Sequence, residues 1–448
     1  MKKDSQTILQ EKAILIASID TRFQLESTKY YIFALIFLSN VLCYILSGYP
    51  QGLETALQSP PFDFSGLEYG IFYGICSFPN IILPLFIGIH IDKNGFSSLL
   101  ILILSLFTFC GAIIITVGSH YVSWGYMCLG RLLLGVGVEN IGLILKKILL
   151  QITTKDESVA AWGLFLVSNR IGSMIASWFP PYFYSITESV TSSFFVAILF
   201  DLALIIFLFF ALILTTKTQT LHTTVCTTGE ISSWSILKNF SRETPWVFWI
   251  MTLLNCINFY VFYGFFSSAN SFLTKEANLD SVDASYFLII FSTFCGLFQP
   301  FIGYLFSKIG YYVYAIIIGS LINLSAFSLF LIMYGTDDSY LVLIPILLLG
   351  FGYSCCSTFV FSGFGVIVSP KNHGLAYGML QNCLNIGALA GPLVFGIVKD
   401  MTRNYDDGYF WAIMETLIAQ GLIGVLGVVI LVVDFLTIKS LSVKRQIV

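Results

Sequence analysis

The sequence predicts an all-α membrane protein whose twelve transmembrane helices form two halves of six. The first observation is the composition: 57% of the 448 residues are hydrophobic and only 10% are charged, against about 25% charged in a soluble domain. The second is a series of twelve apolar runs, and the third is a short motif that occurs once in each half. A soluble protein of this length would lack the polar surface that it needs.

Each of the twelve runs is long enough to cross a bilayer, since about 20 helical residues span about 30 Å of hydrocarbon. The first six runs are 29–50, 67–90, 97–118, 122–149, 158–182 and 191–215. The second six are 245–267, 284–306, 311–334, 340–368, 374–398 and 409–437. They predict two bundles and three polar segments: bundles at 29–215 and 245–437, a central loop at 216–244, and tails at 1–28 and 438–448.

Both tails and the central loop are predicted to lie in the cytosol. The N-terminus lacks the short apolar segment and cleavage site of a signal peptide. Most Lys and Arg residues, Lys146 and Lys147 among them, flank connections on the same side as the central loop, which is the pattern of cytosolic connections. Lys275, Lys399 and Arg403 are exceptions, because they fall at connections expected on the opposite side.

A short motif at the end of the second run is repeated at the end of the eighth. The stretches "IGIHIDKNG" (87–95) and "IGYLFSKIG" (302–310) both fit G-x-x-x-[DS]-K-x-G. Two six-helix halves related by sequence are typical of secondary transporters, in which the substrate site lies between the halves near the bilayer midplane.

These motifs resemble those of a known family. Gly88, Asp92, Lys93 and Gly95 match the loop signature of the major facilitator superfamily, and "GRLLLGVGVEN" (130–140) matches its fourth-span signature. The second copy is weaker, because Ser307 replaces the acidic residue. The resemblance implies the major facilitator fold. It also implies gating or structural roles for Gly88, Asp92, Lys93, Gly95, Arg131, Gly303, Lys308 and Gly310.

Four segments are similar to one branch of that superfamily, which includes the lysosomal dipeptide uniporter. The segments are "CSFPNIILPLFIGIHIDKNG", "GRLLLGVGVEN", "NRIGS" and "GLAYGMLQNCLNIG". The resemblance implies a carrier of short peptides, and it implies that a glutamate and an arginine at matching positions bind the substrate.

Glu139 and Arg170 are the residues at those positions, and both lie inside apolar runs. Burying an unpaired charge there costs on the order of several kcal/mol. At 1.5 Å per residue, the distances from the run ends place both near the bilayer midplane, on consecutive antiparallel helices. In one interpretation, Arg170 binds a substrate carboxylate and Glu139 a substrate ammonium, which suits a zwitterion. In the alternative, the two residues pair with each other and only fix the helices.

Neutral polar residues inside the runs are candidates to complete the site. Asn255 and Asn258 are three residues apart and share a helical face, as do Asn382 and Asn385. Any one of them is more often an interhelical hydrogen bond than a ligand contact, but together they offer donors and acceptors for a peptide backbone. The predicted neutral set is Asn40, Tyr44, Asn255, Asn258, Tyr353, Gln381, Asn382 and Asn385.

Two further charges inside the runs are predicted to be structural. Arg131 lies about two turns from Glu139, toward the non-cytosolic end, and the resemblance implies a role in packing and coupling of helices. Asp201 lies midway along the sixth run, so we expect it to face inward and find a partner on another helix.

No sequence pattern indicates an enzyme, a metal site or a cofactor, and none is expected. A phosphate loop, zinc-ligand spacing and a nucleophile elbow are missing from the sequence, and a net charge of −3 gives no reason to expect a nucleic-acid partner. The first run lacks the E-x-x-E-R signature of proton-coupled peptide carriers, and no histidine lies in the middle of a run. Facilitated diffusion is therefore favoured over proton coupling, although Glu139 could carry a proton.

Two short patterns bear on location and partners. Glu11, Leu15 and Ile16 in "EKAILI" fit the acidic dileucine pattern that directs proteins to endosomes and lysosomes; an amphipathic turn is the alternative. The two N-x-[ST] sequons, at Asn239 and Asn323, fall in the central loop and inside a run, so neither is expected to be glycosylated. In the resembling branch a glycosylated one-span accessory protein shields the carrier, and a similar partner is a hypothesis here.

The leading hypothesis is a uniporter that moves short peptides or amino acids across an endolysosomal-type membrane by alternating access. The plasma membrane is the alternative location. The runner-up within transport is an organic-anion carrier in which Arg170 binds the anion and Glu139 is its counter-ion. A transport-inactive receptor or scaffold is also considered, but it would be expected to carry long additional domains.

Overall fold

The computed structural model describes residues 28–94, 98–153, 155–219, 240–276, 279–333, 339–368, 373–406 and 408–436. The sorting pattern of Glu11, Leu15 and Ile16 lies outside these residues, as do Gly95, nearly all of both tails and most of the central loop. The side chains of Asp92, Lys93 and Lys308 also lie outside the described set, so their gating role stays a prediction.

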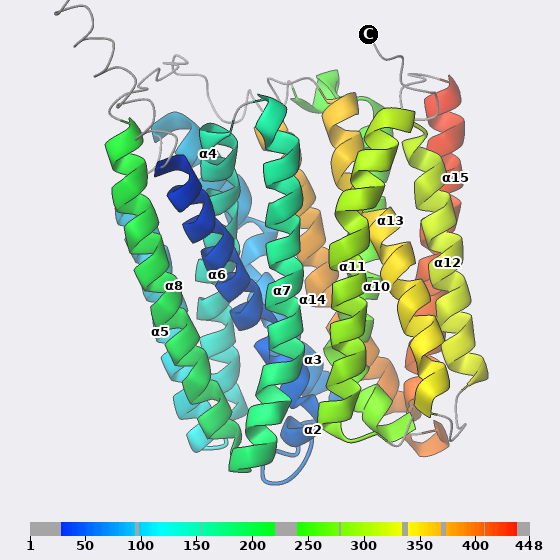
Figure 1. The fold of residues 1–448 in the computed structure, drawn as a ribbon. Coiled ribbons are helices and arrows are strands. Elements are labelled where there is room, and N and C mark those ends of the chain that lie inside the picture. The colour runs from blue at the N-terminus through cyan, green and yellow to red at the C-terminus, as the bar shows by residue number, and fades with distance from the viewer. Residues whose placement is uncertain are drawn as a thin grey trace, which may run out of the picture.

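The described chain is a bundle of long helices that run in roughly the same direction or its reverse (Figure 1). The first half contains a helix at 28–48, η1 (Tyr49–Leu53), α2 (Glu54–Leu57), α3 (Gly66–Gly74), η2 (Ile75–Ser77), η3 (Pro79–Ile81), α4 (Leu83–Asn94), α5 (Ser98–His120), α6 (Trp124–Ile152), α7 (Lys155–Thr187) and α8 (Val190–Gln219). The second half contains α10 (Trp246–Glu276), α11 (Ser281–Ile309), α12 (Tyr312–Ile332), η4 (Ser339–Val342), α13 (Leu343–Ile367), α14 (His373–Asp406) and α15 (Tyr409–Leu436).

Within the described residues, nine helices are long and apolar enough to cross a membrane by themselves. The other three predicted passages correspond to α3 with α4, to α7, and to α13, whose apolar part at Leu343–Thr358 is shorter. The helices are thus consistent with the twelve predicted passages. The run predicted at 67–90 is not one helix, because it breaks into 3₁₀ turns around Pro79, which has no N–H to continue the helical hydrogen bonds.

The helix α10 is longer than the run predicted at 245–267. It continues through "SSANSFLTKE", where Ser267, Ser268, Asn270 and Ser271 ended the apolar count but are buried between helices. Asn270, for example, donates hydrogen bonds to the Ser281 carbonyl and to Ser285 Oγ, each at 2.9 Å. Polar side chains that are satisfied by neighbouring helices do not stop a membrane helix.

Each half has its own apolar core. Fully buried side chains of the first include Ile36, Phe72 and Leu204. Those of the second include Phe248, Phe327 and Ile430. Large apolar side chains are also exposed all along the outer helices, as expected where bilayer hydrocarbon rather than water covers the surface.

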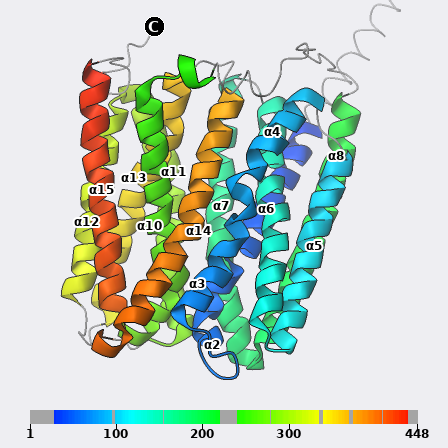
Figure 2. The ribbon, with the colours of Figure 1, turned by 180° about the vertical axis from the view of Figure 1, so that it is seen from behind.

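The two halves meet along two pairs of segments on opposite faces. On one face α7 lies against α11 (Figure 1), and on the other α3 and α4 lie against α14 (Figure 2). We call the end of the bundle that carries α2 the α2 end, and the end where α4 stops the α4 end. The sequence predicts that the α4 end is cytosolic.

Glycines let α3 and α14 approach closely at the α2 end. A Cβ added to Gly70 would overlap the Pro392 carbonyl oxygen, and one added to Gly74 would lie 2.8 Å from the Leu389 carbonyl oxygen. Small residues of this kind allow helix backbones to pack directly on each other. The two halves are therefore in close contact at the α2 end.

The second copy of the repeated motif ends a helix. Gly310 is the C-cap of α11 with φ of 81°, a conformation that glycine adopts without steric cost. Gly303 lies seven residues before Gly310 in α11 and packs against Thr358 of α13. In the first copy, a Cβ at Gly88 would meet no atom within 4 Å, so close packing does not account for that glycine.

Candidate functional site

Arg170 lies near the middle of α7, where α7 faces α11. Its Nε donates to the Gln299 side-chain oxygen at 3.1 Å, and its guanidinium carbon lies 5.1 Å from the centre of the Tyr353 ring. Gln299 belongs to α11 and Tyr353 to α13, so both contacts reach into the second half. Gln299 is itself held by a 2.8 Å hydrogen bond to Ser357 Oγ.

Glu139 lies near the middle of α6 and also reaches the second half. Its Oε2 accepts a hydrogen bond from the side-chain amide of Gln381 on α14, at 3.3 Å. The oxygen of the same amide accepts a hydrogen bond from Lys146 Nζ at 3.5 Å. Lys146 is seven residues after Glu139, which puts the two side chains on one face of α6. One amide of the second half therefore contacts a carboxylate and an ammonium of the first.

Glu139 and Arg170 do not pair with each other. Both side chains are described, and no ion pair within 4.0 Å joins them. Both are half-buried, and each hydrogen-bonds to a neutral side chain of the other half. A clamp made of the two charges between α6 and α7 is therefore not present in this structure.

Tyr44 of the first helix connects the two charged residues. It lies close enough to Glu139, Arg170 and Tyr353 to interact electrostatically with all three. Tyr263 of α10 is near Tyr44, Glu139 and Tyr353 in the same way. We define the central cluster as Tyr44, Glu139, Lys146, Arg170, Tyr263, Gln299, Tyr353 and Gln381.

The remaining predicted site residues bond mainly to other helices. Asn40 donates to Ser168 Oγ at 2.7 Å and also to Asn169, which joins the first helix to α7. Asn255 donates to the Leu380 carbonyl at 3.2 Å, and Asn385 donates to the Asn80 carbonyl at 3.0 Å. These three residues hold helices around the central cluster.

Some polar atoms of these asparagines remain without a partner. The Asn258 amide nitrogen and the side-chain oxygens of Asn255, Asn382 and Asn385 are buried without a hydrogen-bond partner. A buried polar atom without a partner is costly, so these are positions at which a bound molecule or a rearrangement would supply one.

Three members of the central cluster were missed as site residues from the sequence. Lys146 was counted among the cytosolic basic residues, and neither Tyr263 nor Gln299 was predicted to bind a substrate. The only signal for Gln299 is its polarity in the middle of the apolar stretch "FCGLFQPFIG".

Arg131 has a different environment from Arg170. It is 1% exposed and donates to the backbone carbonyls of Leu46, Ser47 and Tyr73 at 3.2, 2.9 and 3.3 Å. The helix at 28–48 and α3 both end at these carbonyls, which therefore lack helical partners. In a membrane such groups need an internal donor, and Arg131 is that donor for two interrupted helices.

Asp201 is fully buried in α8, and both of its carboxylate oxygens lack a hydrogen-bond partner. The inward orientation expected from the sequence is observed. The expected hydrogen bond to a partner on another helix is not formed in this structure.

A buried ion pair joins the halves at the α2 end. Lys399 Nζ of α14 lies 3.3 Å from Glu54 Oε1 of α2, with side-chain exposures of 8% and 0%. The same ammonium donates to Gln58 Oε1 at 2.9 Å and to Tyr409 Oη at 2.7 Å. The next residue, Asp400, accepts hydrogen bonds from the Gly66 and Leu67 amides at the start of α3, at 2.8 and 2.7 Å. We call Glu54, Gln58, Lys399, Asp400 and Tyr409 the α2-end latch.

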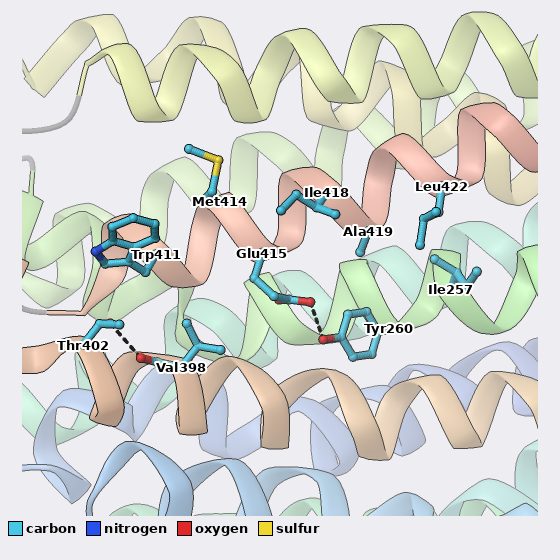
Figure 3. A pocket seen from close by; sticks show the side chains of 10 residues that line it. All are labelled: Ile257, Tyr260, Val398, Thr402, Trp411, Met414, Glu415, Ile418, Ala419 and Leu422. Carbon is cyan, nitrogen blue, oxygen red and sulfur yellow. Dashed lines mark hydrogen bonds between the residues drawn. The ribbon is translucent and has the colours of Figure 1, made fainter.

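A groove of about 590 Å³ lies outside the central cluster, between α10, α14 and α15 (Figure 3). Tyr260 donates a hydrogen bond to Glu415 there, and most of the other lining residues are apolar. Three of them, Trp411, Ile418 and Leu422, are 45 to 63% exposed on the outer surface. Hydrocarbon would cover this surface in a bilayer, so the groove does not suit a zwitterion.

Comparisons with known proteins match this architecture. The family model described as the Major Facilitator Superfamily matches residues 30–392. The lysosomal dipeptide transporter MFSD1 of Bos taurus is 24% identical over 348 residues, which are 75% of this chain and 72% of that protein. The protein of the same name from Homo sapiens is 24% identical over 366 residues, 80% of this chain and 76% of that protein.

Solved structures share the fold at low identity. The nucleoside transporter NupG gives a TM-score of 0.64 at 20% identity, covering 91% of this chain and 98% of that chain. A bacterial homologue of the human lysosomal transporter Spinster, in an inward-facing and unoccupied conformation, gives 0.65 at 15% identity, covering 92% and 98%. Together with the match of the family model over most of the chain, these results show that the chain belongs to the major facilitator superfamily and is a membrane transporter.

Proposed function

We propose that this transporter carries short peptides or amino acids with a free ammonium and a free carboxylate. One observation carries the proposal: Glu139 and Arg170 are not paired with each other, and each hydrogen-bonds to a neutral amide of the other half. The relatives named as lysosomal dipeptide transporters support the same substrate class.

Neutral partners leave the charges of Glu139 and Arg170 incompletely compensated. A charge inside a membrane protein is tolerated when it has an ionic partner or faces water. A neutral amide compensates a charge less well than an opposite charge does. A substrate carboxylate on Arg170 and a substrate ammonium on Glu139 would replace both amides with ionic partners.

Aromatic groups fit the body of a small peptide between these ends. Tyr353 lies under the Arg170 guanidinium and stacks on Phe262, with 4.3 Å between ring centres. Tyr44 lies near both Glu139 and Arg170, and Tyr263 lies near Glu139. Phenol rings provide apolar contact for a side chain and a hydroxyl for the peptide group.

The way the halves are joined supports alternating access. The α2-end latch and the glycine contacts of α3 with α14 close the α2 end. A substrate in the central cluster would then leave or enter through the α4 end, and breaking the latch would open the other route. The central cluster touches both halves, so a bound substrate affects the equilibrium between the two states.

We also propose a location and a mode of coupling. The names of the relatives and the "EKAILI" pattern support an endolysosomal membrane. We propose uniport rather than proton coupling, because the first span has no E-x-x-E-R signature. The position of the two sequons is the ground for proposing a glycosylated accessory protein.

A thermal-shift screen of the purified protein against four ligand classes tests the substrate proposal. Free dipeptides should raise the midpoint of unfolding, because a ligand that binds the folded state stabilises it. Sugars and organic anions should not, and dipeptides blocked at the amino end should do so only weakly. A shift with organic anions alone would overturn the proposal in favour of an anion carrier. Counterflow of labelled dipeptide in proteoliposomes without a pH gradient then tests uniport.

A further inference from the structure

Lys146 gives the central cluster one cation more than a simple zwitterion requires. The charged side chains of the cluster are Glu139, Lys146 and Arg170, one negative and two positive. A substrate with one ammonium and one carboxylate would match Glu139 and Arg170 and leave Lys146 without an ionic partner. No carboxylate of the described residues lies within 4.0 Å of its ammonium.

The structure argues that Lys146 belongs to the site and not to the membrane surface. Lysines near a helix end usually extend toward the interface, and Lys146 is six residues from the end of α6. Its ammonium instead contacts Gln381, the amide that Glu139 also contacts from two turns deeper in the helix. Side chains of an α-helix lean toward its N-terminus, and in α6 that direction leads from Lys146 toward Glu139.

Gln381 couples Glu139 to Lys146, because both side chains bind the same amide. Its nitrogen donates to Glu139 while its oxygen accepts from Lys146. A substrate ammonium that takes the place of the amide at Glu139 moves Gln381 away and deprives Lys146 of its acceptor. A half-buried ammonium without an acceptor is costly, so the best substrate would bring one.

Two other buried cations, Arg131 and Lys399, each have three acceptors. Arg131 donates to three backbone carbonyls, and Lys399 is bound by a carboxylate, an amide oxygen and a phenol. Lys146 has one neutral acceptor at 3.5 Å, which is at the long limit for a hydrogen bond. Lys146 is therefore the least satisfied of these three cations.

We infer that Lys146 is a specificity residue that binds a second carboxylate, and that the preferred substrates are short peptides with an acidic side chain. The inference rests on the proposed function and adds one requirement to it. An extended dipeptide spans roughly 7 Å, and its side-chain carboxylate extends beyond that. A peptide held by Glu139 and Arg170 can thus offer a further carboxylate to a cation on the same face of α6 as Glu139.

The test compares two dipeptides that differ only in charge. Affinities of alanyl-glutamate and alanyl-glutamine are measured by titration calorimetry on the full-length protein. The wild type should bind alanyl-glutamate about tenfold more tightly, as expected for one additional charge-assisted hydrogen bond. Lys146→Gln should remove this preference, so that the affinities for the two dipeptides differ by less than about twofold.

Two further variants separate specificity from structure. Lys147→Gln removes the adjacent positive charge, which points to another side of the helix, and should keep the preference. Lys146→Arg keeps the positive charge and should retain most of the preference for alanyl-glutamate. Thermal midpoints without ligand show whether each variant is folded.

Each alternative result has a distinct meaning. Equal binding of the two dipeptides by the wild type would overturn the role of Lys146 and leave the proposed function standing. An equal loss for both dipeptides in Lys146→Gln would assign Lys146 a structural role and also overturn the inference. Binding of neither dipeptide, with binding of glutarate, would overturn the proposed function and the inference together.

Discussion

The α2-end latch and the central cluster both contain membrane-buried charges, but their partners differ. In the latch, Lys399 has Glu54 as an ionic partner and accepting oxygens from Gln58 and Tyr409. In the central cluster, Arg170 and Lys146 each hydrogen-bond to one neutral amide oxygen. The latch pair is almost completely buried, whereas Glu139 and Arg170 are half-buried.

If the proposed function holds, the difference separates charges that hold the protein together from charges that accept a ligand. A protein loses stability when one partner of a buried ion pair is removed, because the other charge is left without a partner. A charge held by neutral groups can exchange them for a better partner. Both regions join the same two halves, so the first would set how firmly the α2 end closes and the second what the transporter binds.

The largest expected effect is the removal of one latch partner. Lys399→Met leaves the Glu54 carboxylate buried without its cation, which should cost roughly 3 to 5 kcal/mol of folding stability. The thermal midpoint of the purified variant measures the loss. The double variant Glu54→Leu with Lys399→Met should recover most of it, since apolar pairs replace buried ion pairs well.

Lys275 provides the matched control for the latch. It lies 5.7 Å from the Tyr409 ring centre but is exposed. Lys275→Met should cost less than about 1 kcal/mol. If the two lysine variants were equally stable, the latch would not hold the halves together.

The next largest effect is expected from substituting Arg170, which should lower the affinity for the substrate. Arg170→Ala should weaken the affinity for a free dipeptide by roughly 2 to 5 kcal/mol, or at least about 30-fold. The affinity of Arg170→Lys should lie between those of the wild type and Arg170→Ala, because an ammonium keeps the charge but lacks the planar, two-pronged geometry that matches a carboxylate. Binding assays on folded protein decide the matter, and wild-type affinity in Arg170→Ala would remove this residue from the site.

A smaller effect is expected from widening the contact of α3 with α14. Gly70→Ala places a methyl group against the Pro392 carbonyl, and overpacking of this kind costs roughly 1 to 3 kcal/mol. The α2 end should open more readily, as measured by labelling of a cysteine introduced at Ser59. Gly142→Ala is the control, because a Cβ there meets no atom within 4 Å. Identical labelling of the two variants would argue against close packing as the reason for Gly70.

The sequence predicted the fold well because apolar runs record where helices cross hydrocarbon. The run at 97–118 became Ser98–His120, and that at 409–437 became Tyr409–Leu436. The break of the 67–90 run near Pro79 was missed, because hydropathy does not detect the helical hydrogen bond that a proline cannot donate. The polar end of α10 was missed because its side chains are satisfied by other helices.

The site was predicted in part, since depth along a helix can be counted but partners on other helices cannot. Counting residues gave Glu139 and Arg170 a common depth and suggested that they might be an ion pair. Their observed partners, Gln381 and Gln299, come from the other half. Lys399 stood out only as an exception to the charge rule, and its partner Glu54 lies 345 residues away in the chain.

The most direct test of the zwitterion site is the effect of Glu139→Gln on a free and an N-acetylated dipeptide. The substitution keeps the shape and removes the charge. Affinity for alanyl-alanine should fall about ten- to a hundredfold, the value of one charge-assisted hydrogen bond, while the weak affinity for the acetylated peptide should change by less than about threefold. A parallel loss for both peptides, together with a lower thermal midpoint without ligand, would show that Glu139 only supports the structure and would contradict the account.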